Sequence, residues 1–183
     1  MYFIGIDPST SSTGYAVIDE HKKLIDCGRI EGLADDPKSF SFLYKQLTAL
    51  MEEYPPTAIS CETQFIGPNR ETSIKLIRPT GVVLAVAGTW DVPFDFTAPS
   101  SWRHMYQGTG KWSKRDTYDF TLNQYPELIE LFTPYALLKN GNVSTVRMYN
   151  NCNDMTDAIG IANACAVIYE FKTKAGERDA VLS

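Results

Sequence analysis

The sequence is poor in the residues that build zinc sites and disulfide frameworks. Its 183 residues include only four cysteines and two histidines. Cys27, Cys61, Cys152 and Cys165 show no paired spacing, and Cys61 and Cys165 lie in apolar segments. This pattern favours buried free thiols in a reducing compartment over disulfides or a zinc site. Any metal ion would therefore have to be held by oxygen atoms.

Long apolar segments and targeting signals are missing as well. The longest apolar stretch, residues 81–88, is far too short to cross a bilayer. No basic region followed by an apolar core opens the chain. We therefore expect a cytoplasmic protein, from a bacterium or a phage-infected host, with no membrane partner. The hydrophobic fraction of 44% and the charged fraction of 21% are typical of a globular protein, and the length suits one domain over residues 1–183.

Positive charge is scarce overall, since the formal net charge is −5. Taken alone, that value argues against a nucleic-acid partner. Local clustering matters more than the total, because bound metal ions would neutralise the acids of a metal site. The basic residues gather in two segments. One contains Arg70, Lys75 and Arg78, and the other contains Lys111, Lys114 and Arg115.

The first part of the chain reads as a meander followed by a βαβ unit. Three short apolar segments, separated by turns, are residues 2–6, 14–18 and 24–30. Apolar residues at helical spacing then predict a helix over residues 40–54, which Pro55-Pro56 ends. The strand predicted over residues 57–61 should therefore pair in parallel with an earlier strand.

Helices and strands alternate in the second part. We expect helices over 70–88 (kinked or divided at Pro79) and 113–125, a strand over 92–97, a short helix from Pro99, and a last helix from Asp154 to about Thr173. The Asn-rich segment 131–153 is predicted to be mostly a loop insertion, and residues 174–183 a frayed tail. This order of elements is that of the RNase H-like fold, a single α/β domain. It predicts a five-stranded mixed sheet of strand order 3-2-1-4-5 with helices on both faces.

Four carboxylates stand where these elements could bring them together. Asp7 follows the first apolar strand, and Glu62 follows the strand over 57–61. Asp154 and Asp157 are three residues apart at the start of the last helix, so both face the same way. Converging anions repel one another and have no general stabilising use unless cations lie between them. Oxygen ligands suit magnesium or manganese, so the pattern predicts metal-assisted phosphodiester cleavage.

Each motif also has a purely structural interpretation. Asp7 could build a turn, Glu62 could be a solvated acid, and Asp154 could cap a helix. Phe65 could be a lid on the core, or it could stack on an exposed base. The segment 108–115 could be a solvated basic face, although its glycines and a helix beginning near Ser113 suit an anion. The occurrence of all these motifs in one order favours the functional interpretation.

Over nearly its whole length the chain resembles the RuvC-type Holliday-junction resolvases of the RNase H-like nuclease superfamily. The matching motifs are G-I-D-P-S with T-G-Y-A-V-I, C-E-T-Q-F, the helix around residues 75–88, G-T-G-K-W-S-K, and D-M-T-D-A-I-G-I-A. The long segment 131–153, and Ser9 in place of the family's usual glycine, are more similar to the divergent forms of phages and low-GC bacteria.

The resemblance implies a site and an activity. Asp7, Glu62, Asp154 and Asp157 would be catalytic metal ligands for two Mg²⁺ ions, which Mn²⁺ can replace. Lys111 and Lys114 would be catalytic residues that contact the scissile region or nearby phosphates. Phe65 would lie at the junction centre, and Arg70, Lys75, Arg78 and Arg115 would also bind DNA. A homodimer would nick four-way DNA junctions in pairs, leaving 5′-phosphate and 3′-hydroxyl ends.

Three alternatives remain open from the residues alone. A branched-DNA or flap nuclease would use the same acids without strict junction specificity. A DNA-binding module could keep the fold without cleaving. An actin-like or sugar-kinase ATPase also opens with a strand, an Asp and a Thr-Gly loop, but it needs two such halves and a second phosphate loop, which this chain does not supply.

Overall fold

The computed structural model describes the backbone of residues 1–64 and 66–181, and the side chains as far as Ala175. In this part of the chain the strands are β1 (Tyr2–Pro8), β2 (Ser12–Asp19), β3 (Leu24–Glu31), β4 (Ala58–Glu62) and β5 (Phe94–Thr97). They form one sheet of order β3-β2-β1-β4-β5. β1, β2 and β3 pair antiparallel, while β4 pairs in parallel with both β1 and β5. The predicted mixed sheet and its strand order are confirmed.

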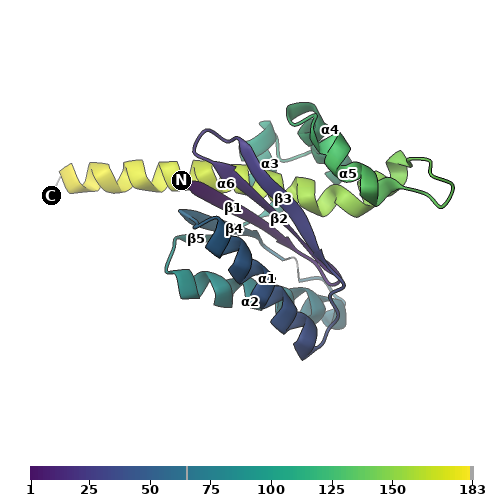
Figure 1. Ribbon diagram of the computed structural model, residues 1–183. Coiled ribbons are helices and arrows are strands. Elements are labelled where there is room, and N and C mark those ends of the chain that lie inside the picture. Colours follow the sequence, from purple (N-terminus) through teal and green to yellow (C-terminus); the bar gives the residue numbers. More distant parts are fainter. Residues whose placement is uncertain (65, 182–183) are drawn as a thin grey trace.

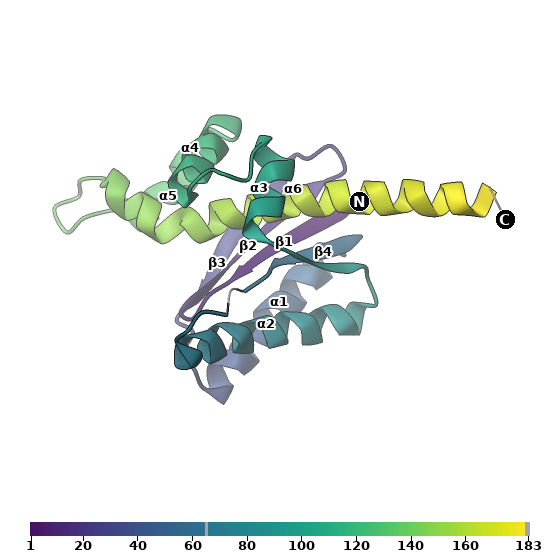
Figure 2. The ribbon, with the colours of Figure 1, turned by 180° about the vertical axis from the view of Figure 1, so that it is seen from behind.

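Helices cover both faces of this sheet. They are α1 (Pro37–Glu53), α2 (Arg70–Trp90), α3 (Pro99–Gln107), α4 (Lys114–Gln124), α5 (Leu128–Ala136) and α6 (Thr145–Val181). Figure 1 shows α1 and α2 below the sheet and α3 to α6 above it. Seen from behind in Figure 2, α6 crosses the sheet and its yellow C-terminal part runs on past the edge. Within the described residues, no helix combines the length and the apolar character needed to cross a bilayer.

A hydrophobic core lies on each side of the sheet. Under the sheet, Leu43 and Leu47 of α1 pack in one cluster with Ile4 of β1 and Ile59 of β4, and all four are fully buried. Burying each such side chain stabilises the fold by roughly 1.5–3 kcal/mol. On the other side, the buried residues of α6 form a second cluster with β1 and β2. The four cysteines are buried and unpaired, as the sequence predicts.

Glycines let α6 lie directly against the sheet. A Cβ atom on Gly5 of β1 would be 2.2 Å from the carbonyl oxygen of Ala158, and one on Gly14 of β2 would be 2.3 Å from that of Asp154. Real Cβ atoms do not approach backbone atoms so closely. The backbones of strand and helix therefore touch, and this contact determines where the acids of α6 lie relative to β1.

Three predictions about element boundaries were wrong. Residues 131–153 are not mostly loop, because α5 extends to Ala136 and α6 begins at Thr145. Asp154 consequently lies well inside α6 rather than in its first turn. The helix also continues to Val181 instead of ending near Thr173.

The asparagines that suggested a loop bind backbone carbonyl oxygens instead. The side-chain N–H of Asn151 donates to Tyr135 O at 2.8 Å, and that of Asn153 donates to Tyr149 O at 3.0 Å. Similarly, Pro79 does not divide α2, which continues through it. Pro79 is buried, and the Thr80 hydroxyl donates to Leu76 O at 3.1 Å within this turn.

Candidate active site

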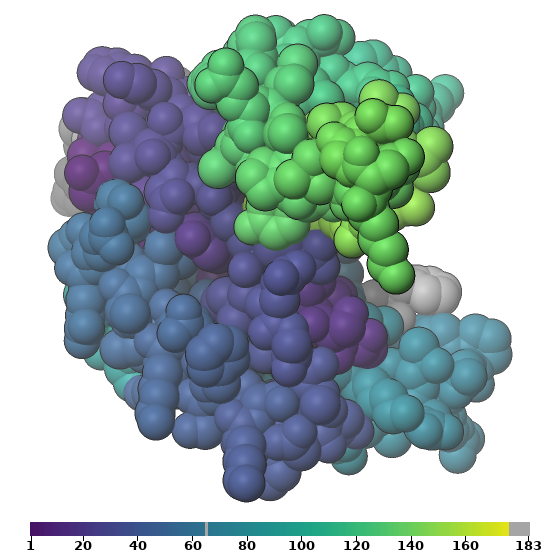
Figure 3. All heavy atoms as spheres, turned by 45° about the vertical axis from the view of Figure 1, so that its right-hand side comes forward, coloured from purple at the N-terminus to yellow at the C-terminus, as the bar shows by residue number. Residues whose placement is uncertain are grey.

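Two carboxylates lie at adjacent strand ends, as predicted. Asp7 is next to last in β1, and Glu62 is the last residue of β4. The parallel register aligns Ile6 with Cys61, so Asp7 and Glu62 occupy the next positions of neighbouring strands. The carboxyl ends of parallel strands are a common place for ligands. Figure 3 faces this end of the sheet and shows the surface hollowed between the green α4–α5 side and the teal start of α2.

Burial and mutual repulsion affect three of the acids. Asp7 is 5% exposed and Asp157 is fully buried. Burial, then the charges of Glu62 and Asp157, raise the pKa of Asp7 well above its usual range. Burial also raises the pKa of Glu62 and of Asp157, and Asp157 adds to the effect on Glu62. Folding has therefore brought together charges that destabilise one another.

Cationic side chains partly offset this repulsion. Lys114 Nζ lies 3.0 Å from Asp157 Oδ2, and Arg103 Nη2 lies 3.8 Å from the same oxygen. Burial lowers the pKa of Lys114, but Asp157 and Asp7 more than reverse this, so the pKa is raised overall. Neither buried oxygen of Asp157 has a well-oriented hydrogen bond among the described residues. A buried carboxylate in this condition can accept a further cation.

Asp154 is held in a different way from the other three acids. The Ser12 hydroxyl donates to its Oδ2 at 2.9 Å, and the backbone N–H of Met155 donates to its Oδ1 at 3.0 Å. Arg29 Nε of β3 lies 3.3 Å from Oδ2. Burial raises the pKa of Asp154, whereas Arg29 lowers it. Like Asp157, this acid has a protein cation close to it, but it also accepts hydrogen bonds at both of its oxygens.

Sequence reasoning missed the partners of these acids. Trp102 Nε1 donates to Glu62 Oε2 at 2.8 Å, and Arg103 follows it on α3. Trp102 had no signal beyond its place in a short helix that opens with a proline. Arg29 had a weak signal, because a long cationic side chain in a strand next to a predicted acidic site is a candidate counter-ion.

The donor set suits a hard divalent cation. All candidate ligand atoms are carboxylate oxygens, as Mg²⁺ and Mn²⁺ prefer, and Asp157 Oδ1 has no hydrogen-bond partner among the described residues. Among the described residues, no three His, Cys, Asp or Glu side chains are already arranged around a common metal position. The carboxylates of Asp7, Glu62 and Asp157 would therefore have to move closer together, and Lys114 would have to move aside.

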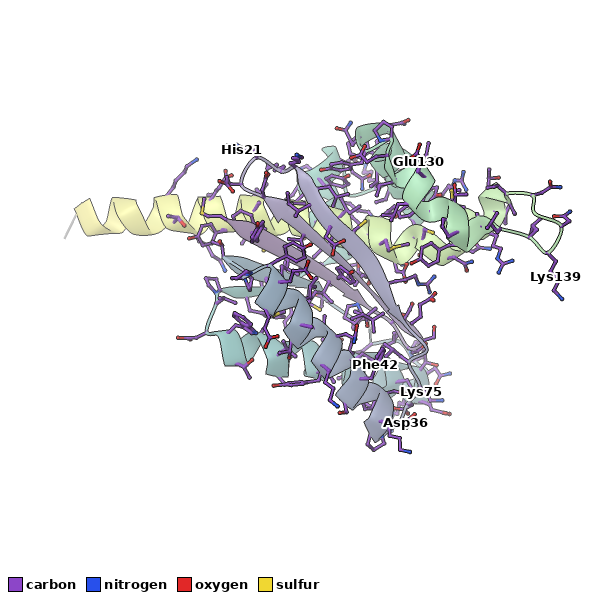
Figure 4. All side chains as sticks on the ribbon, viewed as in Figure 1. His21, Asp36, Phe42, Lys75, Glu130 and Lys139 are labelled. Atoms are coloured by element: carbon purple, nitrogen blue, oxygen red, sulfur yellow. The ribbon has the colours of Figure 1, made fainter. Side chains whose placement is uncertain are left out.

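The predicted DNA-binding residues do not gather in one basic patch. Lys75 pairs with Glu71 at 2.7 Å, and Figure 4 shows Lys75 at the same end of the molecule as Asp36, the N-cap of α1. Other ion pairs join Arg78 to Asp35 at 2.5 Å and Arg115 to Asp119 at 3.0 Å. Arg70 begins α2 and Lys111 lies in the loop before α4; both are exposed. Phe65 lies outside the described residues. Of the predicted basic residues, the described contacts join only Lys114 to the acids.

A cavity of about 400 Å³ lies beside Glu62. Its walls come from Thr63 and Gln64, from the turn containing Pro68 and Asn69, and from the beginning of α2. Leu76 and Pro99 also line this space, and its exposed walls are mainly apolar although polar residues contribute to them.

Comparison with known proteins identifies the family. Residues 3–123 match the family described as crossover junction endodeoxyribonuclease RuvC, a match that ends before Asp154. The RuvC of Brachyspira hyodysenteriae is 26% identical over 171 residues, covering 91% of this chain and 94% of that protein. The RuvC of Chloroherpeton thalassium is 30% identical over 119 residues, and the match spans 64% of that relative.

The fold agrees with this identification. A Thermus thermophilus RuvC structure, solved in complex with Holliday junction substrate, superposes with a TM-score of 0.68 at 18% identity. The superposition covers 93% of this chain and 96% of that one, so it includes the region of α6. The chain therefore belongs to the RuvC family of crossover junction endodeoxyribonucleases, the Holliday junction resolvases of recombination and repair.

Proposed function

We propose that this protein cleaves four-way DNA junctions at the site formed by Asp7, Glu62 and Asp157. The observation that carries the proposal is the fully buried Asp157 carboxylate, which lies among further acids, with Lys114 near its Oδ2 and no hydrogen-bond partner for its Oδ1 among the described residues. This arrangement destabilises the protein unless a cation and a substrate use it. The family match supports the same reaction.

Asp7, Glu62 and Asp157 would hold divalent metal ions, with two Mg²⁺ per site and Mn²⁺ as a substitute. When bound, these ions supply an activated water and stabilise the leaving oxygen. Asp154 supports the site from its bonds to Ser12 and Arg29. Among the described residues, its Oδ1 accepts only from a backbone N–H, so this is the oxygen that could reach a metal.

Lys114 is the best candidate for contacting the reacting phosphate. Its Nζ is already 3.0 Å from Asp157, so a small rotation would bring it to a phosphate bound at the acids. Lys111 lies three residues before it in the exposed loop and would bind a neighbouring phosphate. Arg70 and Arg115 would contribute to DNA affinity from exposed positions. Phe65 remains a sequence prediction for stacking at the junction centre.

A two-fold symmetric substrate calls for two copies of the active site, and α2 offers a face for the second copy. Ile74, Ile77 and Leu84 are exposed to 44–48% on this helix. Gly81 and Gly88 complete the stripe, and a Cβ atom at either would meet nothing within 4 Å. The spacing of alternately three and four residues is that of a helix–helix seam. We infer that two α2 helices pack together in a homodimer.

Cleavage of a labelled four-way junction in Mg²⁺ tests this function. Glu62→Gln should abolish cleavage while junction binding in Ca²⁺ persists, because binding depends mainly on phosphate contacts elsewhere. Glu52→Gln makes the same substitution at an exposed position of α1 and should leave cleavage unchanged. Cleavage by Glu62→Gln at the wild-type rate would contradict the proposal. A duplex of equal length should remain intact throughout.

A further inference from the structure

Trp102 occupies a position that leaves its ring no freedom. It is fully buried and lies with Ile161 and Ala164 in a small cluster between α3 and α6. A Cβ atom on Gly160 would be 2.5 Å from Cζ3 of the indole ring. The ring therefore fills the space that the missing side chain of Gly160 leaves on α6. Its orientation is fixed by packing on the same helix that carries Asp157.

The polar edge of this fixed ring points at Glu62. An indole N–H can only donate a hydrogen bond, and it donates to Glu62 Oε2 at 2.8 Å. This bond favours the ionised carboxylate and holds one of its two oxygens in place. The other oxygen, Oε1, accepts no hydrogen bond from the described residues, so it is available to bind a cation. Glu62 ends its strand, so little else in β4 would restrict its rotamers.

Arg103, the next residue of α3, lies close to a second acid of the site, Asp157. Its guanidinium carbon lies 4.5 Å from the centroid of the Trp102 ring, in cation–π geometry. Its Nε donates to the Thr117 hydroxyl at 3.3 Å, and its Nη2 lies 3.8 Å from Asp157 Oδ2. Consecutive residues of α3 thus contact Glu62 and Asp157, which come from different elements.

We propose that Trp102 is a positioning residue that holds Glu62 in the rotamer needed for metal binding. This inference rests on the proposed function, since it concerns the same acids. Groups that orient a metal ligand typically contribute 10–100-fold to metal affinity or activity. Trp102 acts through Glu62 and touches neither the metal nor the DNA.

The role of Trp102 can be tested without a cleavage assay. The test measures the Mn²⁺ affinity of the DNA-free protein, by electron paramagnetic resonance of the free ion. Trp102→Phe keeps an aromatic ring and removes the N–H, and it should weaken Mn²⁺ binding by about 10-fold. Tyr106→Phe is the matched control, because Tyr106 packs on the same cluster and loses only its hydrogen bond to Thr121. Its Mn²⁺ affinity should stay within about 2-fold of wild type. If Trp102→Phe also stays within that range, the inference is wrong.

A double-mutant cycle separates positioning from a structural role. In a Glu62→Ala background, adding Trp102→Phe should change Mn²⁺ affinity no further. An equal loss in both backgrounds would mean that Trp102 supports the fold generally, which overturns the proposal. If Trp102→Phe does not fold, Trp102→benzothienylalanine keeps the bicyclic ring and removes only the donor. The same 10-fold loss is then expected, and wild-type affinity would refute the role.

The cycle also distinguishes this inference from the proposed function. If Glu62→Ala weakens Mn²⁺ binding and removal of the indole N–H does not, only the role of Trp102 falls. If Glu62→Ala leaves Mn²⁺ affinity unchanged, Glu62 is not a ligand, and the metal site and the role of Trp102 both fall.

Discussion

Replacing Asp7 with asparagine should make the metal-free protein more stable while it destroys the proposed activity. Asp7 is buried beside Glu62 and Asp157, and Lys114 only partly offsets their repulsion. Asn has nearly the same shape and carries no charge. We expect the free energy of unfolding in EDTA at neutral pH to rise by about 1–2 kcal/mol, the usual range of stabilising substitutions. For a chain of this size the midpoint of thermal unfolding would rise by about 2–8 °C.

The stability gained by Asp7→Asn should increase with pH. Because its folded pKa is raised, Asp7 keeps its proton in the folded chain at pH values where the unfolded chain has lost it. Its contribution to stability is thus fully present below the ordinary pKa near 3.8 and is lost as the pH rises through the folded pKa. The difference between Asp7→Asn and wild type should therefore vanish near pH 4 and grow towards neutral pH.

Thermal unfolding in EDTA, followed by circular dichroism from pH 4 to 8, measures this difference. Asp119→Asn is the control, since Asp119 is half exposed in a surface ion pair and should change stability by less than about 1 kcal/mol. Adding Mg²⁺ should stabilise wild type more than Asp7→Asn. A variant less stable than wild type at neutral pH in EDTA would refute the argument that the acids repel one another.

Three further outcomes are expected. Gly160→Ala should destabilise the fold by about 1–3 kcal/mol, because the new methyl group overlaps the Trp102 ring; an unchanged melting temperature would contradict the packing. Ca²⁺ should support junction binding without cleavage, whereas Mn²⁺ should support both, since Ca²⁺ prefers longer and less regular coordination; rapid cutting in Ca²⁺ would argue against two aligned ions. Leu84→Glu should give a monomer in sedimentation equilibrium, while Leu137→Glu, exposed to nearly the same degree outside α2, should not alter the oligomeric state.

The sheet and the two strand-end acids could be predicted because their signals are local. An apolar segment that ends in a single acid predicts a buried strand with the acid at its end. Asp7 and Glu62 lie at the strand ends where that pattern places them. The β1–β4 pairing followed from the helix between the strands. These inferences need only the periodicity of neighbouring residues.

The features that the sequence did not predict correctly depend on contacts between residues far apart in the chain. The start of α6 was missed because asparagine usually indicates a loop, whereas here Asn151 binds a carbonyl of α5. The ion pairs of the two basic segments, Arg78 with Asp35 and Arg115 with Asp119, also join residues that no motif linked. The roles of Trp102 and Arg29 depend on which acids they reach across the fold, and no spacing in the sequence encodes that.

The direct contact of α6 with β1 and β2 has an evolutionary consequence. Since main-chain atoms meet at Gly5 and Gly14, the separation between the strand-end acids and those of α6 does not depend on the size of any core side chain. Mutations can accumulate among the leucines, isoleucines and valines of both cores, and compensate one another, without altering the spacing of the acids. Lineages of this family can thus drift far apart in sequence and keep one reaction, provided that the two glycine positions stay free of side chains.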